Sequence, residues 1–232
     1  MRIPGSVEAY SKKYALRNRP LVANELGGIK QVVVIPVLAE KNSLRATLTS
    51  LSRNSPRELE RTLILCVVNN RGSHITSPQE IRDNQATIRY LHAIMGGASG
   101  ALSFGSEGVA DGRESSRTPL RLAYIDASSS GVEMPDKWGG VGTARKIGMD
   151  ASLRIFDYAL IREKLIISLD ADTVVESNYL ESIGVFFAGG SKAAVVNYSH
   201  QRPTTVRGRL AIDTYEIFLR YYVLGLRYAG SP

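Results

Sequence analysis

The chain has 232 residues, of which 44% are hydrophobic and 22% charged, and its formal net charge is +7. These values are typical of one globular domain and exclude a disordered or fibrous chain, and no run approaches the ~20 apolar residues of a membrane-spanning helix. The positive charge suits an anionic partner, but no basic stripe with interleaved aromatic residues indicates nucleic acid, and the single cysteine excludes an internal disulfide.

The first 30 residues are polar and predict a lead-in segment before the folded domain. They lack the apolar core of a signal peptide, so we expect a cytoplasmic location. From Gln31 onward, short aliphatic runs alternate with stretches of helical periodicity. The runs that predict strands are residues 31–37, 62–68, 120–126, 165–169 and 193–198.

Helices are predicted between these strands, because apolar residues recur there at helical spacing, as in Leu44, Leu48 and Leu51. Residues that commonly begin or end helices frame each segment. The expected helices are one beginning at Asn42 or Ser43, one opened by the capping box of Ser77 and Glu80 and running toward Met95, one from Thr143 to about Ile161, and one capped by Ser177 and ended by Gly189-Gly190.

Strands that alternate with helices predict an α/β domain whose central sheet is mainly parallel and flanked by helices. Ligands of such sheets bind beyond the carboxyl ends of the strands. Residues 96–118 interrupt the pattern with a Gly- and Ser-rich stretch, for which we expect a disordered loop rather than a functional lid.

Polar side chains follow the predicted strands at their carboxyl ends. Asp170 and Asp172 come directly after the run at 165–169, and paired carboxylates suit a hard divalent cation such as Mg²⁺ or Mn²⁺. Glu40 can accept hydrogen bonds from a ribose or base, or simply favour the start of a helix. Asn69 and Asn70 can read a nucleobase edge, or form a turn.

The segment WGGVGTARKIGMD places three glycines directly before a predicted helix. The free N–H groups at a helix start favour phosphate. Arg145 and Lys146 add cations where the helix dipole disfavours them, which indicates an anion to be neutralised. The alternative is a Gly-rich turn followed by solvated basic residues. The spacing fits neither the dinucleotide-binding fingerprint nor a Walker loop.

Together these segments resemble the nucleotide-diphospho-sugar glycosyltransferases of family 2, which have the Rossmann-like GT-A fold. The resemblance covers residues 31–200 and has the family's motif order. IPVLAE resembles the Pro-containing first strand that ends in Glu, and VVNN stands where the family usually has two aspartates. GGVGTARKIGMD resembles the Gly-rich, Ala-Arg-bearing helix start, and LDADTVVESNYL resembles the Asp-x-Asp strand and helix.

The resemblance implies a metal-dependent and inverting transfer of a sugar from a UDP- or GDP-sugar to an unknown acceptor. It implies a nucleoside pocket at the first two strands, a diphosphate or sugar contact from the basic pair, and Asp170 and Asp172 as the site of Mn²⁺ or Mg²⁺. The implied donor-binding residues are Pro36, Glu40, Asn69, Asn70, Gly142, Arg145, Lys146, Asp170 and Asp172.

The family's catalytic base is an acidic residue well downstream of Asp-x-Asp, and neither Asp213 nor Glu216 has the expected context. We therefore expect the base beyond Pro232, and the chain to be the donor-binding part of a longer enzyme that lacks its acceptor part. Residues 31–205 would form the nucleotide-sugar-binding domain. Residues 206–232 predict a C-terminal helix, whose mixture of Arg, Tyr, Phe and Leu allows peripheral membrane contact or self-association.

Two other functions fit parts of the pattern. A sugar-phosphate nucleotidyltransferase shares the sheet and the carboxylate-bound metal, but it usually carries a Gly-rich basic loop directly after the first strand, where this chain has LAEKNSL. A non-catalytic module that binds sugar nucleotides would explain the missing base.

Overall fold

The computed structural model describes residues 3–16, 19–72, 74–96, 119–137, 139–159 and 163–230. These residues form two compact units, one up to Phe186 and the other from Phe187 onward. The first unit contains the sheet and most of the helices, and the second contains one long helix. Each unit is described by itself.

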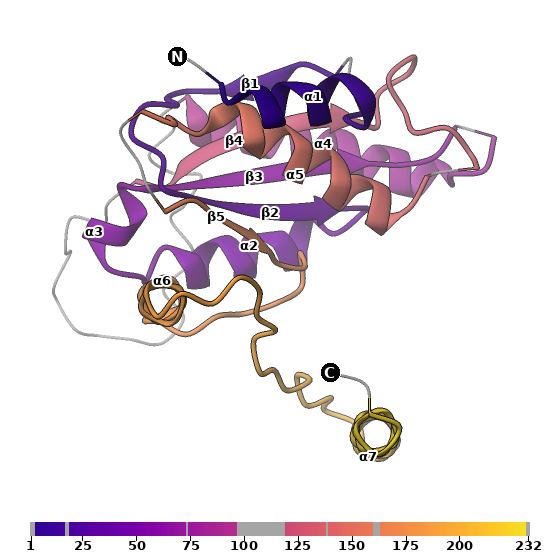
Figure 1. The fold of residues 1–232 in the computed structure, drawn as a ribbon. Coiled ribbons are helices and arrows are strands. Elements are labelled where there is room, and N and C mark those ends of the chain that lie inside the picture. The colour runs from indigo at the N-terminus through magenta and orange to yellow at the C-terminus, as the bar shows by residue number, and fades with distance from the viewer. Residues whose placement is uncertain are drawn as a thin grey trace, which may run out of the picture. The chain divides into compact units, whose positions relative to one another are not determined.

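The first unit is an α/β fold built on a five-stranded sheet (Figure 1). The order in the sheet is β1-β4-β3-β2-β5, in which β2 to β5 are parallel and β1 pairs antiparallel with β4. The strands are β1 (Leu21–Ala23), β2 (Gln31–Val37), β3 (Thr62–Asn69), β4 (Arg121–Ala127) and β5 (Leu165–Ser168). The prediction of a Rossmann-like fold with a mainly parallel sheet is confirmed.

The central strands β2 and β3 are buried along their whole length. Side chains of a strand point alternately to both faces, so a strand that is covered on both faces needs an unbroken apolar run. Val32 and Val34 therefore belong to the core on one face, whereas Val33 and Ile35 belong to the core on the other. This is why the aliphatic runs predicted parallel strands.

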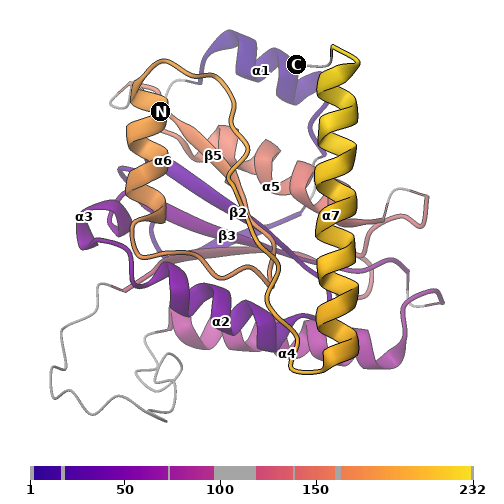
Figure 2. The ribbon, with the colours of Figure 1, turned by 90° about the horizontal axis from the view of Figure 1, so that it is seen from below.

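Helices cover both faces of the sheet, with α5 on one side and α2 and α6 on the other (Figure 1). Figure 2 shows α2 and α4 running alongside each other, and Leu44, Leu48 and Leu91 of these helices enter the same core. The helices of the first unit are α1 (Gly5–Lys13), α2 (Lys41–Leu51), α3 (Pro56–Leu59), α4 (Pro78–Met95), α5 (Val141–Ile155) and most of α6 (Tyr179–Ala188).

Gly148 allows α5 to lie close to the sheet. A Cβ atom at this position would come within 2.3 Å of Val34 Cγ1 and 3.1 Å of Val67 Cγ2. Any larger residue would therefore push the helix away from β2 and β3. The close contact fixes the height of the N-terminal half of α5 above the carboxyl ends of these strands.

The helix boundaries differ in part from those that the sequence predicts. The capping box of Ser77 and Glu80 is present, and both of its hydrogen bonds form. In contrast, α2 begins at Lys41 after Glu40, with no side-chain cap from Asn42 or Ser43. The helix α5 begins at Val141 instead of Thr143 and ends at Ile155, because the backbone turns extended at Phe156.

The first 30 residues are more than a lead-in segment, because they supply α1 and the edge strand β1. The carboxylate of Asp150 on α5 accepts hydrogen bonds from Tyr10 Oη (2.9 Å) and from the Leu16 N–H (3.1 Å). Asp150 is only 5% exposed. The N-terminal segment is therefore fixed to α5 by a buried carboxylate.

The second unit contains α7 (Val206–Tyr228), which begins where the sequence predicts a C-terminal helix. Residues 193–198 precede it without forming a strand, so this prediction is wrong. Their run is apolar but pairs with no strand among the described residues, and Val195 is exposed. In the described part of the chain, no helix is both long and apolar enough to cross a bilayer. The loop expected at 96–118 lies outside the described residues, apart from Gly96.

Candidate functional site

The strand order places a topological switch point between β2 and β5. From β2 the chain proceeds to β3 and β4 on one side, and α5 then returns it to β5 on the other side of β2. Ligands of open α/β sheets bind outside the carboxyl ends of the strands at such a point. We call this region the switch edge, and define it as residues 38–40 after β2, residues 169–173 after β5 and residues 140–145 at the start of α5.

Glu40 lies at the switch edge, directly before α2. Burial raises the pKa of its carboxyl, the hydrogen bond from the Leu38 N–H lowers it, and the charges of Asp172 and Asp170 raise it further. The Asp-x-Asp carboxylates are therefore close enough to Glu40 to affect its carboxyl, although the sequence predicted them from two separate motifs.

The Asp-x-Asp segment is fixed by backbone hydrogen bonds on both sides. The Leu169 N–H donates to Val34 O (3.0 Å), and Thr47 Oγ1 on α2 donates to Ala171 O (2.7 Å). Ala171 is 1% exposed, whereas Asp170 and Asp172 on either side of it are exposed. The chain thus anchors the middle residue and leaves both carboxylates at the surface.

Arg145 joins α5 to this segment, because its guanidinium forms an ion pair with the carboxylate of Asp170. The earlier helix start places Arg145 one turn inside α5. Side chains of a helix tilt toward its N-terminus, so the guanidinium can still reach back to the switch edge. Arg145 Nε is buried and has no hydrogen-bond partner among the described residues. The structure therefore brings together two of the predicted site residues.

The two asparagines after β3 have different surroundings. Asn70 is held by the protein itself, since its Nδ2 donates to Arg71 O (2.6 Å) and its Oδ1 accepts from Asn84 Nδ2 (3.1 Å). Asn69 is 3% exposed, and its Oδ1 has no partner among the described residues. Asn69 shares the sheet face of Val67, which α5 covers. Of the two amides, Asn69 is the one whose side-chain oxygen is not already used by another described residue.

Lys146 is not brought to the switch edge. Its Nζ lies 2.7 Å from Asp150 Oδ2 and 3.2 Å from Tyr10 Oη. Burial lowers the pKa of Lys146, but the hydrogen bonds and charges of these two partners outweigh this effect and raise it. The sequence placed Lys146 beside Arg145 at a diphosphate, whereas the structure uses it to hold the N-terminal segment.

The remaining predicted residues, Pro36 and Gly142, lie next to the switch edge or in it and affect the path of the backbone there. Pro36 is buried within β2 beyond Val34, the last residue that pairs with β5, so its missing N–H costs no hydrogen bond there. Gly142 is exposed in the first turn of α5. Gly139 must lack a side chain, since a Cβ atom would lie 2.5 Å from Arg71 Cγ, and its carbonyl accepts from Arg71 Nε (2.6 Å).

Asn84 on α4 is the residue that sequence reasoning missed. It is fully buried, and its side chain connects the loop after β2 to the end of β3. Asn84 shares the buried face of α4 with Thr87 and Leu91 at helical spacing. A polar amide on an apolar helix face was the signal that could have found it.

The carboxylates fit a divalent cation in type, because Mg²⁺ is commonly held by one or two carboxylates together with waters and substrate phosphates. In the described parts of the chain, however, no group of three or more His, Cys, Asp and Glu side chains is arranged to hold a metal. Asp170 is already paired with Arg145. A cation at Asp170 and Asp172 would therefore compete with Arg145.

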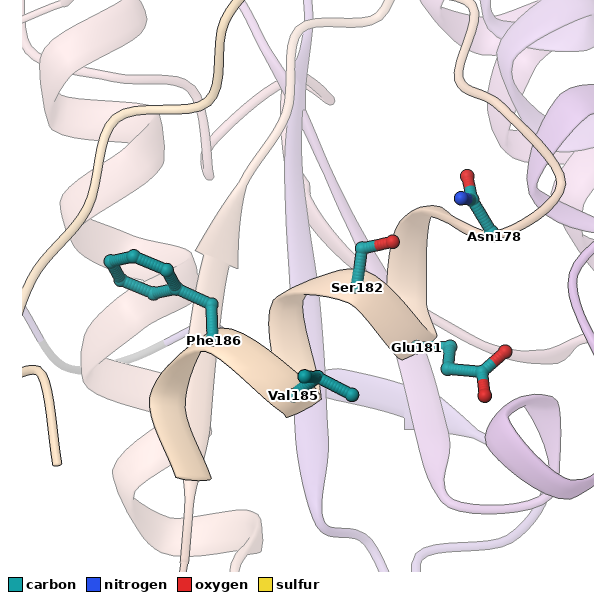
Figure 3. Close-up of a pocket in the computed structure, with 5 residues that line it drawn as sticks. All are labelled: Asn178, Glu181, Ser182, Val185 and Phe186. Carbon is teal, nitrogen blue, oxygen red and sulfur yellow. The ribbon is translucent and has the colours of Figure 1, made fainter. Parts of the chain in front are cut away.

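A surface hollow lies along α6, where Asn178, Glu181, Ser182, Val185 and Phe186 line it (Figure 3). None of these residues belongs to the switch edge. Figure 3 shows their side chains projecting from one helix and from the residue just before it. The hollow contains no pair of groups suited to phosphate or metal binding, so we do not assign the site to it.

No model of a protein family matches the sequence, and no curated protein is significantly similar to it. Among solved structures, S. aureus TarS (residues 1–349) is similar over 69% of this chain and 33% of its own, with 13% sequence identity and a TM-score of 0.37. The chain thus spans about a third of that solved chain. A likeness of this degree carries no argument about function.

Proposed function

We propose that the switch edge binds the diphosphate of a nucleoside-diphosphate sugar, and that the chain is the donor-binding part of a glycosyltransferase with the GT-A fold. The observation that carries the proposal is the meeting of Arg145 with Asp170 at the topological switch point, next to Glu40 and Asp172. A cation and several carboxylates at one strand edge suit a ligand that is itself a complex of phosphate and metal.

Each residue would act on a different part of the donor. Asp170 and Asp172 would hold Mn²⁺ or Mg²⁺, which when bound stabilises the negative charge of the departing diphosphate. Arg145 would exchange its partner, from Asp170 to a phosphate oxygen, and the N–H groups at the start of α5 would face the same anion. Asn69 and Glu40 would hold the nucleoside. We assign no catalytic base and no acceptor.

Calorimetric titration with UDP and GDP, each with and without Mn²⁺ or Mg²⁺, tests the proposal. We expect one of the nucleotides to bind only with metal, and Asp172→Asn to abolish that binding. Asp157→Asn is the matched control, because Asp157 lies beyond the opposite end of α5 and an asparagine there can still accept from the Ala159 N–H.

Equal binding with and without metal would contradict the proposal. Nucleotide binding without donor hydrolysis would indicate the non-catalytic module. Pyrophosphate release from a nucleoside triphosphate and a sugar phosphate would indicate a nucleotidyltransferase.

A further inference from the structure

The loop after β2 contains a backbone conformation that L-residues rarely adopt. Ala39 has φ of +54°, and among the described residues no other non-glycine has a positive φ. In this region the Cβ atom crowds the backbone, so surrounding interactions must hold the residue there. Ala39 directly precedes Glu40, and its conformation therefore sets the direction in which the Glu40 side chain leaves the loop.

The interaction that holds Ala39 comes from Asn84 on α4, whose Oδ1 accepts the Ala39 N–H (2.8 Å). Its Nδ2 donates to Asn69 O and to Asn70 Oδ1, both at 3.1 Å. Only this orientation of the amide satisfies all three bonds, since the opposite one would set the NH₂ group against an N–H. Asn84 is 0% exposed, so bulk water does not compete for these three bonds in the folded chain.

The residue before Asn84 in α4, Asp83, holds the backbone on the other side of Glu40. Asp83 Oδ2 accepts the Lys41 N–H (3.1 Å), and the Leu38 N–H donates to the Glu40 carboxylate (3.5 Å). The backbone is thus fixed both before and after Glu40 by adjacent side chains of one helix. That helix belongs to the opposite face of the sheet from α5 and to a different part of the sequence from β2.

We propose that Asn84 is a positioning residue, which holds Ala39 in its left-handed conformation and thereby presents Glu40 to the nucleoside at the switch edge. This inference rests on the proposed function. In this proposal Asn84 does not contact the nucleotide. Its effect on nucleotide binding passes through Glu40.

A double-mutant cycle separates this role from a general contribution to stability. We expect Asn84→Ala to weaken UDP binding in the presence of Mn²⁺ about tenfold, and to have less than a twofold effect when Glu40 is already alanine. Thr87→Ala is the matched control, because Thr87 is equally buried on the same helix face and, among the described residues, its side chain bonds within α4. It should lower the melting temperature and leave the affinity unchanged.

Two changes in the loop test the same geometry without disturbing α4. Ala39→Gly accepts a positive φ without strain, so it should restore most of the affinity in the Asn84→Ala background. Ala39→Val resists a positive φ, so it should weaken UDP binding about as much as Asn84→Ala does. The Ala39→Val variant decides the question if Asn84→Ala does not fold.

Equal loss of affinity with and without Glu40, or no rescue by Ala39→Gly, would overturn the positioning role. If the wild-type chain binds no nucleotide at all, the proposed function fails separately. Hydrogen exchange of the Ala39 amide then decides the inference. A rise of at least tenfold in Asn84→Ala, with protection of the β2 amides unchanged, supports it, whereas an unchanged rate overturns it.

Discussion

The guanidinium of Arg145 on α5 is paired with the carboxylate of Asp170 after β5, across the topological switch point of the sheet. The two side chains are 34% and 53% exposed. Ion pairs as exposed as this one contribute only about 0–1 kcal/mol to stability, so stability does not explain the pair. The pair instead lies between the start of α5 and the Asp-x-Asp segment, where Arg145 can bind an anion and Asp170 can bind a cation.

The first prediction concerns competition for Asp170. Replacing Arg145 with alanine should strengthen the binding of Mn²⁺ alone, because Asp170 loses its internal counter-ion. The same change should weaken binding of the complex of UDP with Mn²⁺ by a factor of about 10 to 150, since a charge-assisted hydrogen bond to phosphate is worth about 1.5–3 kcal/mol. Electron paramagnetic resonance of free Mn²⁺ and calorimetry with UDP measure the two effects.

The prediction depends on Arg145→Ala changing the two affinities in opposite directions. Were Arg145→Ala to weaken Mn²⁺ and UDP–Mn²⁺ alike, Arg145 would only be shaping the loop. Were it to change neither, the pair would have no part in binding.

The second prediction concerns the neighbouring cation, Lys146. Lys146→Met should destabilise the fold by about 1–3 kcal/mol, because Asp150 stays buried with one charged partner fewer. It should also leave UDP affinity within twofold of the wild type, since Lys146 Nζ contacts Tyr10 and Asp150 instead of the switch edge. Urea unfolding and calorimetry give the two quantities. A variant of unchanged stability and lost affinity would show that Lys146 turns to the ligand after all.

The sequence predicts the elements whose signals are local. Unbroken aliphatic runs correspond to β2 and β3, which are buried on both faces, and the reciprocal bonds of Ser77 and Glu80 begin α4 as expected. The predicted strand at 193–198 has the same kind of run, but a strand exists only where another strand accepts its hydrogen bonds. The three-residue strand β1 is the opposite case. Its own residues do not predict a strand, and it is one because it pairs with β4.

The candidate site shows the same division. Asp170, Asp172 and Glu40 follow strands and could be predicted to share one sheet edge, since parallel strands end on the same side. The orientation of the Lys146 side chain could not be predicted, because it depends on a contact with Tyr10, which is 136 residues away in the chain. The role of Asn84 could not be predicted for the same reason, since its partners lie in the loop after β2 and at the end of β3.

The third prediction distinguishes the two asparagines after β3. Asn70→Ala should cost about 1–3 kcal/mol of stability, because it leaves the buried amide of Asn84 without one acceptor. Asn69→Ala removes an oxygen that has no partner among the described residues, and should cost less. For nucleoside selectivity we expect the larger effect from the other variant: Asn69→Ala should reduce the preference between UDP and GDP more than Asn70→Ala does. Paired thermal unfolding and competition titrations measure both, and equal selectivity in the two variants would contradict the assignment.

The fourth prediction concerns pH and Glu40. The pKa of its carboxyl is raised in the folded chain, by burial first and then by the charges of Asp172 and Asp170 against the opposing Leu38 N–H. The free energy of unfolding therefore falls as the pH rises from 4.5, the ordinary pKa of a glutamate, through the raised pKa of Glu40 in the folded chain, because ionised Glu40 is less favourable there. Glu40→Gln, which resembles the protonated form, should raise the melting temperature at pH 7 and lose this advantage below pH 4.5, where both states are protonated.

The same Glu40→Gln variant should bind UDP with Mn²⁺ less tightly at pH 7, because the amide offers one acceptor fewer and no charge. Higher stability combined with lower affinity is the expected mark of a residue retained for binding. Asp157→Asn, which removes a carboxylate near the far end of α5 and can still accept from the Ala159 N–H, should not combine higher stability with lower affinity. A Glu40→Gln chain that is less stable than the wild type at pH 7 would mean that the three carboxylates do not repel one another, and that a cation already compensates them.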